Sequence, residues 1–124
     1  MKITCGTDII EIERIKEAIE RPGNKFIQEI YTEVEIQYCE SKRNAKYEHY
    51  AARFAAKEAI FKAVSIFLED KFSISWKNAE ILNDEKGRPY IHFIGIEFPQ
   101  IKSIDISISH CKQYAVANVT IIYK

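Results

Sequence analysis

The chain has 124 residues, of which 47% are hydrophobic, so it can bury the core of one compact domain, and we expect no second domain. Its 18 basic and 18 acidic residues give zero net charge, which argues against a general nucleic-acid binder. Three widely separated cysteines argue against a disulfide framework and a zinc site, and no segment resembles a signal peptide or a membrane span. We therefore expect a single cytoplasmic domain over residues 1–124, without nucleic-acid or membrane partners.

The first half of the chain predicts one strand followed by helices. Residues 3–10 are β-branched around Gly6 and predict a strand with Asp8 near its end. Apolar residues then recur at helical spacing from position 11 until Pro22-Gly23 stops the pattern. Thr32-Glu33-Val34-Glu35 has the form of a capping box and predicts a helix to about position 42. We expect the longest helix to run from about position 47 to 68.

The second half changes to alternating apolar and polar residues, which is typical of strands. We expect strands at about 74–81 and 90–94, joined by a turn over 83–89 that contains Gly87 and Pro89. Residues 103–109 and 114–123 predict a second hairpin. This order predicts an α+β fold, with an antiparallel sheet packed against a long central helix and shorter helices.

The long helix is unusual because residues 51–68 are apolar almost all round yet carry four charges. Such a helix should be buried in a core or an interface, where each charge needs a partner. At about 100° per residue, Glu58, Lys62 and Ser65 share one side of the helix. Arg53 and Lys57 occupy a different stripe. An internal ion pair between Glu58 and Lys62 is the simplest explanation of the first side.

A second explanation is a metal site shared by Asp8 and Glu58. Two carboxylates, one at a strand end and one on a buried helix, need compensation, and one hard cation would supply it. Mg²⁺ commonly takes one or two protein carboxylates and completes its shell with water and phosphate oxygens. Lys62, one turn from Glu58, would then hold a neighbouring phosphate.

Other polar residues have weaker support as ligands. His110 follows Ser107-Ile108-Ser109 at a strand end, where it either projects into a cleft or is an ordinary surface histidine. Arg53 could bind a phosphate through two hydrogen bonds, or pair with a glutamate. The turn offers two basic side chains, Lys86 and Arg88, while its glycine and proline are explained by turn chemistry.

Basic residues also occur near the predicted Asp8 site. Arg14, Arg21 and Lys25 lie on or just after the first helix, interleaved with glutamates. A solvated helix with mixed charges is the default interpretation, and alone it implies no partner.

Three segments carry a family resemblance: Gly6-Thr7-Asp8-Ile9; Arg53-Phe54-Ala55-Ala56-Lys57-Glu58-Ala59 with Lys62-Ala63; and Ser107-Ile108-Ser109-His110. Their order and spacing, and the chain length, resemble the holo-acyl-carrier-protein synthase family of 4'-phosphopantetheinyl transferases. The similarity extends over nearly the whole chain. The long-helix motif is highly specific, whereas the other two segments are informative only in register with it.

The resemblance implies a 4'-phosphopantetheinyl transferase-like fold and a defined reaction. The enzyme would transfer the phosphopantetheine arm of coenzyme A to a serine of apo acyl carrier protein, releasing adenosine 3',5'-bisphosphate and supporting fatty acid biosynthesis. Asp8 and Glu58 would bind Mg²⁺, with Lys62 near the pyrophosphate as the third catalytic residue. The implied coenzyme A ligands are Arg53, Lys62, Ser65, Lys86, Gly87, Arg88, Pro89, Ser109 and His110.

Small members of this family are usually homotrimers with active sites between protomers. The residues matched by Arg53 and His110 reach coenzyme A from the neighbouring chain, which would explain two polar stripes on one helix. Carrier proteins present an acidic helix beside their reactive serine, and family members meet it with basic residues on the first helix. Arg14 is the best match here, followed by Arg21 and Lys25.

The implied mechanism is attack of the carrier serine on the β-phosphate of coenzyme A. Mg²⁺ and Lys62 would offset the negative charge that develops as the pyrophosphate linkage breaks. For the base that takes the serine proton, Asp8 acting through a metal-bound water is our first choice and Glu58 the second.

The sequence departs from the family pattern at two places. Residues 64–70 contain no glycine where many relatives have a glycine-rich segment, and Cys111 follows the histidine where a hydroxyl residue is common. We expect a changed affinity for coenzyme A rather than another reaction. Two alternatives stay open: an inactive carrier-binding module, and a metal-dependent nuclease using Asp8, Glu58 and Lys62. Zero net charge and a helical Glu-Lys pair count against the nuclease.

Overall fold

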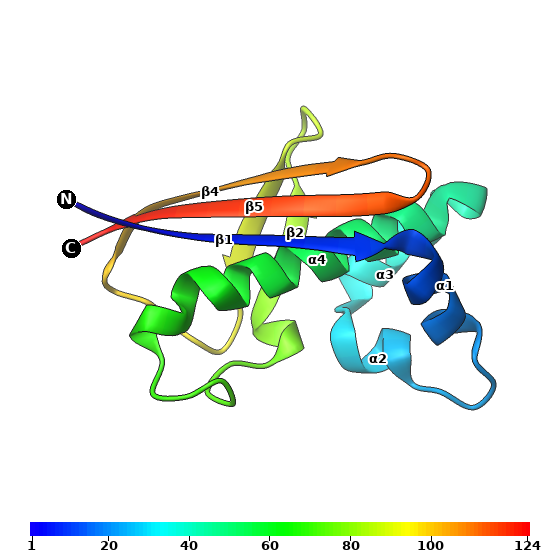
Figure 1. The fold of residues 1–124 in the computed structure, drawn as a ribbon, viewed down its shortest axis with the longest axis horizontal. Coiled ribbons are helices and arrows are strands. Elements are labelled where there is room, and N and C mark those ends of the chain that lie inside the picture. Colours follow the sequence, from blue (N-terminus) through cyan, green and yellow to red (C-terminus); the bar gives the residue numbers. More distant parts are fainter.

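The chain forms four α-helices and five strands, and the longest helix, α4, lies at the centre of the others (Figure 1). The computed structural model describes all of residues 1–124. Short 3₁₀ turns occur at Arg43–Ala45, Ser65–Phe67 and Trp76–Asn78. The main elements are β1 (Lys2–Glu11), α1 (Ile12–Glu20), α2 (Phe26–Ile30), α3 (Glu33–Glu40), α4 (Lys46–Val64), β2 (Ala79–Asn83), β3 (Pro89–Phe93), β4 (Ile101–His110) and β5 (Tyr114–Tyr123).

The strands form two antiparallel sheets. β5 is the central strand of a three-stranded sheet, with β1 and β4 on its two sides, and β2 pairs with β3 in a separate hairpin. The β1–β5 pairing is regular over its whole length, from Lys2 opposite Tyr123 to Glu11 opposite Tyr114. The predicted α+β class and both predicted hairpins are therefore confirmed, although the strands are divided between two sheets.

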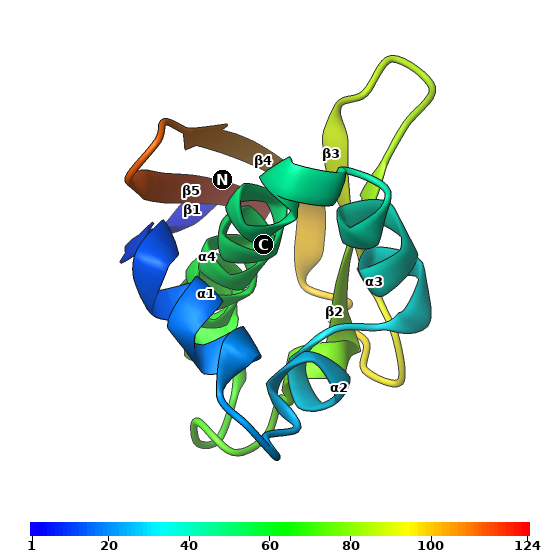
Figure 2. The same cartoon turned by 90° about the vertical axis from the view of Figure 1, so that its right-hand side faces the viewer.

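The long helix α4 crosses one face of the three-stranded sheet, and α1 and α3 lie on opposite sides of it (Figures 1 and 2). Eleven residues of α4 are buried, which confirms the prediction of a helix enclosed on most sides. Many of them are alanines, so the strands approach the helix backbone closely. None of the helices combines the length and the apolar character that a bilayer span requires.

Gly6 marks the closest approach between β1 and α4. A Cβ built on Gly6 would lie 1.9 Å from the carbonyl oxygen of Ala59, which is far inside van der Waals contact. No side chain therefore fits between strand and helix at this point. Because Asp8 is two residues further along β1, on the same side of the pleated strand as Gly6, it is held against the same helix.

Three details differ from the sequence prediction. The segment predicted as a strand from position 74 begins instead with a 3₁₀ turn at Trp76–Asn78, and β2 starts only at Ala79. Ser75 and Asn78 cap this turn through each other's side chains, a local bonding pattern that apolar alternation does not reveal. The α-helical part of the longest helix ends at Val64, followed by the 3₁₀ turn. Helix α2 was not predicted because five residues are too few to show a periodic pattern.

Candidate functional site

The side chains of Asp8, Glu58 and Lys62 gather where β1 passes α4. Lys62 Nζ donates a hydrogen bond to the carbonyl oxygen of Thr7 at 2.9 Å and lies 3.4 Å from Asp8 Oδ1. Glu58 is one helical turn before Lys62. Burial raises the pKa of the Glu58 carboxyl, the charge of Asp8 raises it further, and Lys62 partly offsets both effects. The two distant carboxylates therefore interact within one chain.

The Lys62 contacts also test one explanation for the helix charges. The ion pair between Glu58 and Lys62 that the helical spacing favoured is not observed, and Lys62 pairs with Asp8 on β1 instead. Glu58 is left half-buried without a salt bridge. Two carboxylates beside one lysine leave a net negative charge at this position.

This charge balance fits a divalent cation. No group of three or more His, Cys, Asp or Glu side chains is arranged to hold a metal ion, so an ion bound only by protein side chains is not supported. Mg²⁺ is commonly held by one or two carboxylates, with substrate phosphates and water completing its shell. Asp8 and Glu58 provide such a pair.

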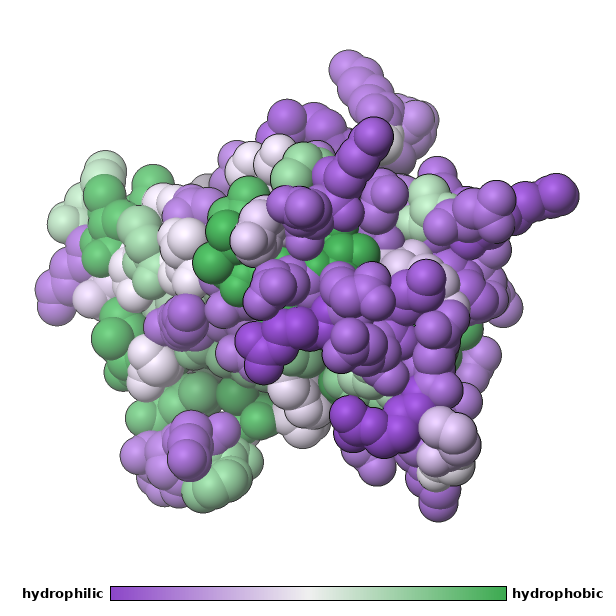
Figure 3. Space-filling model, turned by 45° about the vertical axis from the view of Figure 1, so that its right-hand side comes forward, coloured by the Kyte–Doolittle hydropathy of each residue, from purple (hydrophilic) through white to green (hydrophobic).

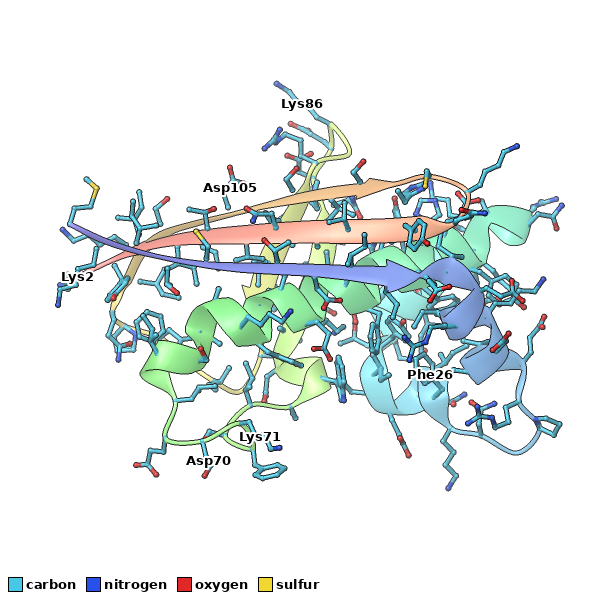
Figure 4. All side chains as sticks on the ribbon, in the orientation of Figure 1. Lys2, Phe26, Asp70, Lys71, Lys86 and Asp105 are labelled. Atoms are coloured by element: carbon cyan, nitrogen blue, oxygen red, sulfur yellow. The ribbon has the colours of Figure 1, made fainter.

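Glu58 also opens onto a pocket of about 340 Å³ below α4. Its apolar walls come from Phe61, Leu68 and Ile74, and its rim includes Asp70 and Lys71 of the following loop, which are labelled in Figure 4. Ser65 lines the same pocket and donates its hydroxyl to the carbonyl oxygen of Lys62 at 2.7 Å. This is the segment without glycine, and it brings acidic side chains to the edge of the pocket.

Arg53 lies on a different side of α4, as the helical spacing predicted. It is only 4% exposed, and its Nη2 donates to Asn83 Oδ1 at 2.6 Å. Its guanidinium carbon is 4.0 Å from the centre of the Tyr38 ring, a cation–π arrangement. Its Nε has no hydrogen-bond partner within the chain. As a coenzyme A ligand Arg53 stays a prediction, and Asn83 accepts the one hydrogen bond that its guanidinium donates within the chain.

The turn between β2 and β3 is connected to Arg53 through Asn83, whose Nδ2 donates to the Gly87 carbonyl oxygen at 3.1 Å. Asp84 organises the turn, because its Oδ1 accepts hydrogen bonds from the backbone N–H groups of Lys86 and Arg88. Gly87 has φ of +83°, in the left-handed region that favours glycine. Lys86 projects from the tip of this hairpin (Figure 4).

Arg88 and Pro89 line a groove of about 460 Å³ beside the three-stranded sheet. The other polar residues of the groove are Asp105, Ser107, Asn118 and Thr120. Arg88 Nη2 lies 3.8 Å from Asp105 Oδ1, and both side chains are largely exposed.

His110 and Ser109 end strand β4 beside the first turns of α4. His110 Nδ1 lies 3.4 Å from Glu48 Oε2, and its ring centre is 5.5 Å from that of His49. Burial and the neighbouring His110 lower the pKa of His49. His110 therefore contacts two residues of α4, Glu48 and His49, rather than being an isolated histidine in a turn.

The predicted coenzyme A ligands thus fall into two groups within one chain. Lys62 and Ser65 belong with Asp8 and Glu58, whereas Arg53 belongs with the hairpin turn and lies near the histidine cluster through Tyr38 and His49. No side-chain hydrogen bond or ion pair joins the two groups.

The predicted carrier-binding residues are all exposed near one end of the molecule. Arg14 is on α1, and Arg21 and Lys25 are in the connection to α2. Arg14 also lines a small pocket with Ile9, Ile10, Glu11 and Tyr114. Figure 3 views this end obliquely and shows mostly hydrophilic residues there.

Sequence reasoning missed one polar feature next to the site, the ion pair between Lys57 and Glu35. Both side chains are fully buried, with Lys57 Nζ 2.9 Å from Glu35 Oε1. The helix pattern indicated that Lys57 needs a partner, and the confirmed capping box placed Glu35 at the start of α3. Nothing local in the sequence connects the two.

The sequence of this chain is similar to those of other proteins over nearly its whole length. Residues 4–119 match the profile of the 4'-phosphopantetheinyl transferase superfamily. The holo-[acyl-carrier-protein] synthase of Ruminiclostridium cellulolyticum is 46% identical over 126 residues, covering 98% of this chain and 92% of that protein. The corresponding protein of Koribacter versatilis is 40% identical over 124 residues, covering 96% of this chain and 97% of its own length.

Solved structures agree with the fold. The Chronobacterium ammoniagenes ACPS-CoA complex superimposes with a TM-score of 0.82 at 27% identity, covering 100% of this chain and 99% of that one. A holo-(acyl-carrier-protein) synthase from Bacillus anthracis, in complex with CoA (3',5'-ADP), has a TM-score of 0.80 at 34% identity, with coverage of 98% and 96%. Sequence and fold thus agree from end to end, and the chain belongs to the 4'-phosphopantetheinyl transferase superfamily.

Proposed function

We propose that this chain is a holo-acyl-carrier-protein synthase that transfers the 4'-phosphopantetheine group of coenzyme A to a serine of apo acyl carrier protein. The observation that carries this proposal is the meeting of Asp8 on β1 with Lys62 on α4, beside the half-buried Glu58. The relatives named above are holo-acyl-carrier-protein synthases, and two of the similar structures contain coenzyme A.

In this reaction the serine oxygen attacks the β-phosphorus of coenzyme A. The bond from that phosphorus to the bridging oxygen breaks, and adenosine 3',5'-bisphosphate leaves with the bonding electrons. Lys62 is suited to hold the pyrophosphate, because its ammonium group lies beside Asp8 in the proposed metal site and its side chain is exposed to an incoming substrate. The serine proton passes to a carboxylate of the site, with Asp8 as the first choice and Glu58 as the second.

The cofactor in this proposal is Mg²⁺, held by Asp8 and Glu58. When bound, it would neutralise negative charge on the pyrophosphate as the linkage breaks. The net negative charge of the two carboxylates beside one lysine supports this assignment. The same argument makes Asp8, Glu58 and Lys62 the catalytic residues.

The coenzyme A contacts are proposed to come from two protomers of a homotrimer. Lys62 and Ser65 would act from one chain, while Arg53, the 86–89 turn, Ser109 and His110 would act from its neighbour. The separation of these residues into two groups on different sides of α4 supports this arrangement. Arg14, Arg21 and Lys25, which are exposed, would meet the acidic helix of the carrier. The holo carrier would serve fatty acid biosynthesis in the cytoplasm.

Mass spectrometry of the carrier tests the proposal. The protein is incubated with coenzyme A, Mg²⁺ and an apo acyl carrier protein, and the carrier is then weighed. We expect a gain equal to one phosphopantetheine group, and no gain when the carrier serine is replaced by alanine. Absence of a gain with several carriers would refute the transferase proposal and leave the inactive carrier-binding module as the alternative.

A further inference from the structure

The buried ion pair between Lys57 and Glu35 connects four elements: α3, α4, the 3₁₀ turn Trp76–Asn78 and β2. Lys57 Nζ, on α4, donates to the carbonyl oxygens of Trp76 at 2.9 Å and Ala79 at 2.7 Å, and to Glu35 Oε1 at 2.9 Å. Glu35 Oε2 accepts the backbone N–H of Ile81 on β2 at 2.8 Å. The three hydrogens of the ammonium group thus have three acceptors, and none is left for a substrate.

Trp76, whose carbonyl group Lys57 holds, packs its ring on α4. Its centre is 5.1 Å from that of Phe54, in a stacked arrangement, and 5.1 Å from that of Phe61. Phe54 precedes Glu58 by four residues and Phe61 follows it by three, so both rings lie on the Glu58 side of the helix. Phe61 also lines the pocket onto which Glu58 opens. The three rings form an aromatic wall on the Glu58 side of α4.

We propose that Lys57 is a positioning residue for phosphopantetheinyl transfer, which acts by fixing the Trp76 turn and thereby the aromatic wall beside Glu58. This inference rests on the proposed function. Although Lys57 is the sequence neighbour of Glu58, its side chain is 0% exposed, so it does not touch coenzyme A or the carrier. Its hydrogen bonds connect the carbonyl groups of Trp76 and Ala79, at the two ends of this segment, to α4.

The need for a charged pair at this position is not explained by stability. Well-packed apolar residues often replace a buried ion pair without loss of stability, whereas removing one partner leaves an unpaired buried charge and strongly destabilises the fold. What an apolar pair cannot do is donate to the carbonyl groups of Trp76 and Ala79. The pair therefore contributes the placement of this segment.

The double variant Lys57→Met/Glu35→Gln tests the proposal, because it removes both charges together and keeps an acceptor for the Ile81 N–H. Trp76 is the only tryptophan of the chain, so its fluorescence reports on the turn directly. We expect a folded protein whose emission shifts to longer wavelength. Its kcat should fall about tenfold to a hundredfold, while its KM for coenzyme A changes less than kcat.

The matched control is Lys77→Met, which removes an exposed lysine from the same 3₁₀ turn and should leave emission and kcat unchanged. A double variant with wild-type emission and kcat would overturn the proposal. If the wild-type protein itself shows no transfer, the proposed function fails, and the emission measurement still decides whether Lys57 fixes the turn.

A second pair of variants covers the case in which the double variant does not fold. Trp76→Ala removes the ring and leaves the Lys57 bonds to the backbone in place, so we expect a similar fall in kcat. Trp76→Phe should restore most of it, because a smaller aromatic ring still packs between Phe54 and Phe61. Wild-type kcat in Trp76→Ala would show that the aromatic wall has no part in the reaction, and would refute the proposed route from Lys57 to Glu58.

Discussion

Lys62 and Asp8 are 54 positions apart in the sequence, yet Lys62 Nζ lies 3.4 Å from Asp8 Oδ1 across the contact between α4 and β1. The contact depends on the glycine at position 6, which lets the strand lie against the helix backbone. Glu58 adds a second carboxylate on the same side of α4, and its pKa is raised partly by the charge of Asp8. A bound pyrophosphate would therefore meet one lysine and two mutually repelling carboxylates, which supports the proposal of a divalent cation at this site.

Asp8→Asn and Glu58→Gln should each remove most transfer activity without unfolding the protein. Both substitutions keep the side-chain shape and remove one charge from the proposed metal site. We expect kcat/KM to fall at least about a hundredfold, as for loss of a group that stabilises developing charge. Carrier mass gain measured against time checks this, with the exposed Glu97→Gln as the control. Full turnover by either variant would refute the assigned site.

Glu58→Gln should also raise the melting temperature of the protein measured without metal at neutral pH. Burial and Asp8 raise the folded-state pKa of Glu58, so the ionised carboxylate is less favourable in the folded than in the unfolded chain. The protonated carboxyl group carries no such penalty. The stability associated with Glu58 is therefore fully present below the unfolded-state pKa and is lost as the pH rises through the raised folded-state pKa. The gain from Glu58→Gln should therefore disappear in acid.

Titration of the Glu58 carboxyl by NMR in the metal-free protein measures the same effect directly. We expect a midpoint above the ordinary glutamate value, moved back toward it by Asp8→Asn because the neighbouring charge is then gone. A midpoint at or below the ordinary value would contradict the described interaction between the two carboxylates.

Gly6→Ala should destabilise the contact on which the site depends. The new Cβ would meet the Ala59 carbonyl oxygen, which is backbone and cannot move independently of α4. We expect a loss of about 1–3 kcal/mol in the free energy of unfolding, as for other overpacked sites. Urea unfolding measures it, and Cys5→Ala at the exposed neighbouring position is the control. An unchanged stability would show that strand and helix are further apart than described.

Arg14→Glu should weaken binding of the carrier and leave binding of coenzyme A unchanged. Arg14 is exposed on α1. In the proposed complex, a glutamate at this position would face the acidic helix of the carrier and repel it. We expect KM for the carrier to rise about tenfold, as for a charge reversal at the edge of an interface. Lys2→Glu, at the opposite end of β1 from α1 (Figures 1 and 4), is the control. A normal carrier KM with weakened coenzyme A binding would refute the assignment.

Much of the fold could be predicted from the sequence because its signals are local. Alternation along residues 103–109 predicted β4, the Thr32–Glu35 capping box predicted the start of α3, and the apolar residues all round the helix over 51–68 predicted a buried α4. The 3₁₀ turn at Trp76–Asn78 was not predicted, because side-chain capping rather than apolar spacing determines it.

The site was less predictable because its contacts join distant parts of the chain. Helical spacing placed Lys62 beside Glu58, but the actual partner of Lys62 is Asp8, whose position depends on strand-to-helix packing. The partner of Lys57 is Glu35, on another helix. The metal ligands were suggested by two carboxylates that need compensation, the coenzyme A contacts mainly by family resemblance, and both stay predictions.

A crystal structure with coenzyme A and Mn²⁺ in place of Mg²⁺ would test the central assignment most directly, since the anomalous signal of Mn²⁺ locates the ion. The account predicts one ion bound by the carboxylates of Asp8 and Glu58 and by oxygens of the coenzyme A pyrophosphate. An ion bound elsewhere, with these two carboxylates unligated and the pyrophosphate away from Lys62, would contradict it.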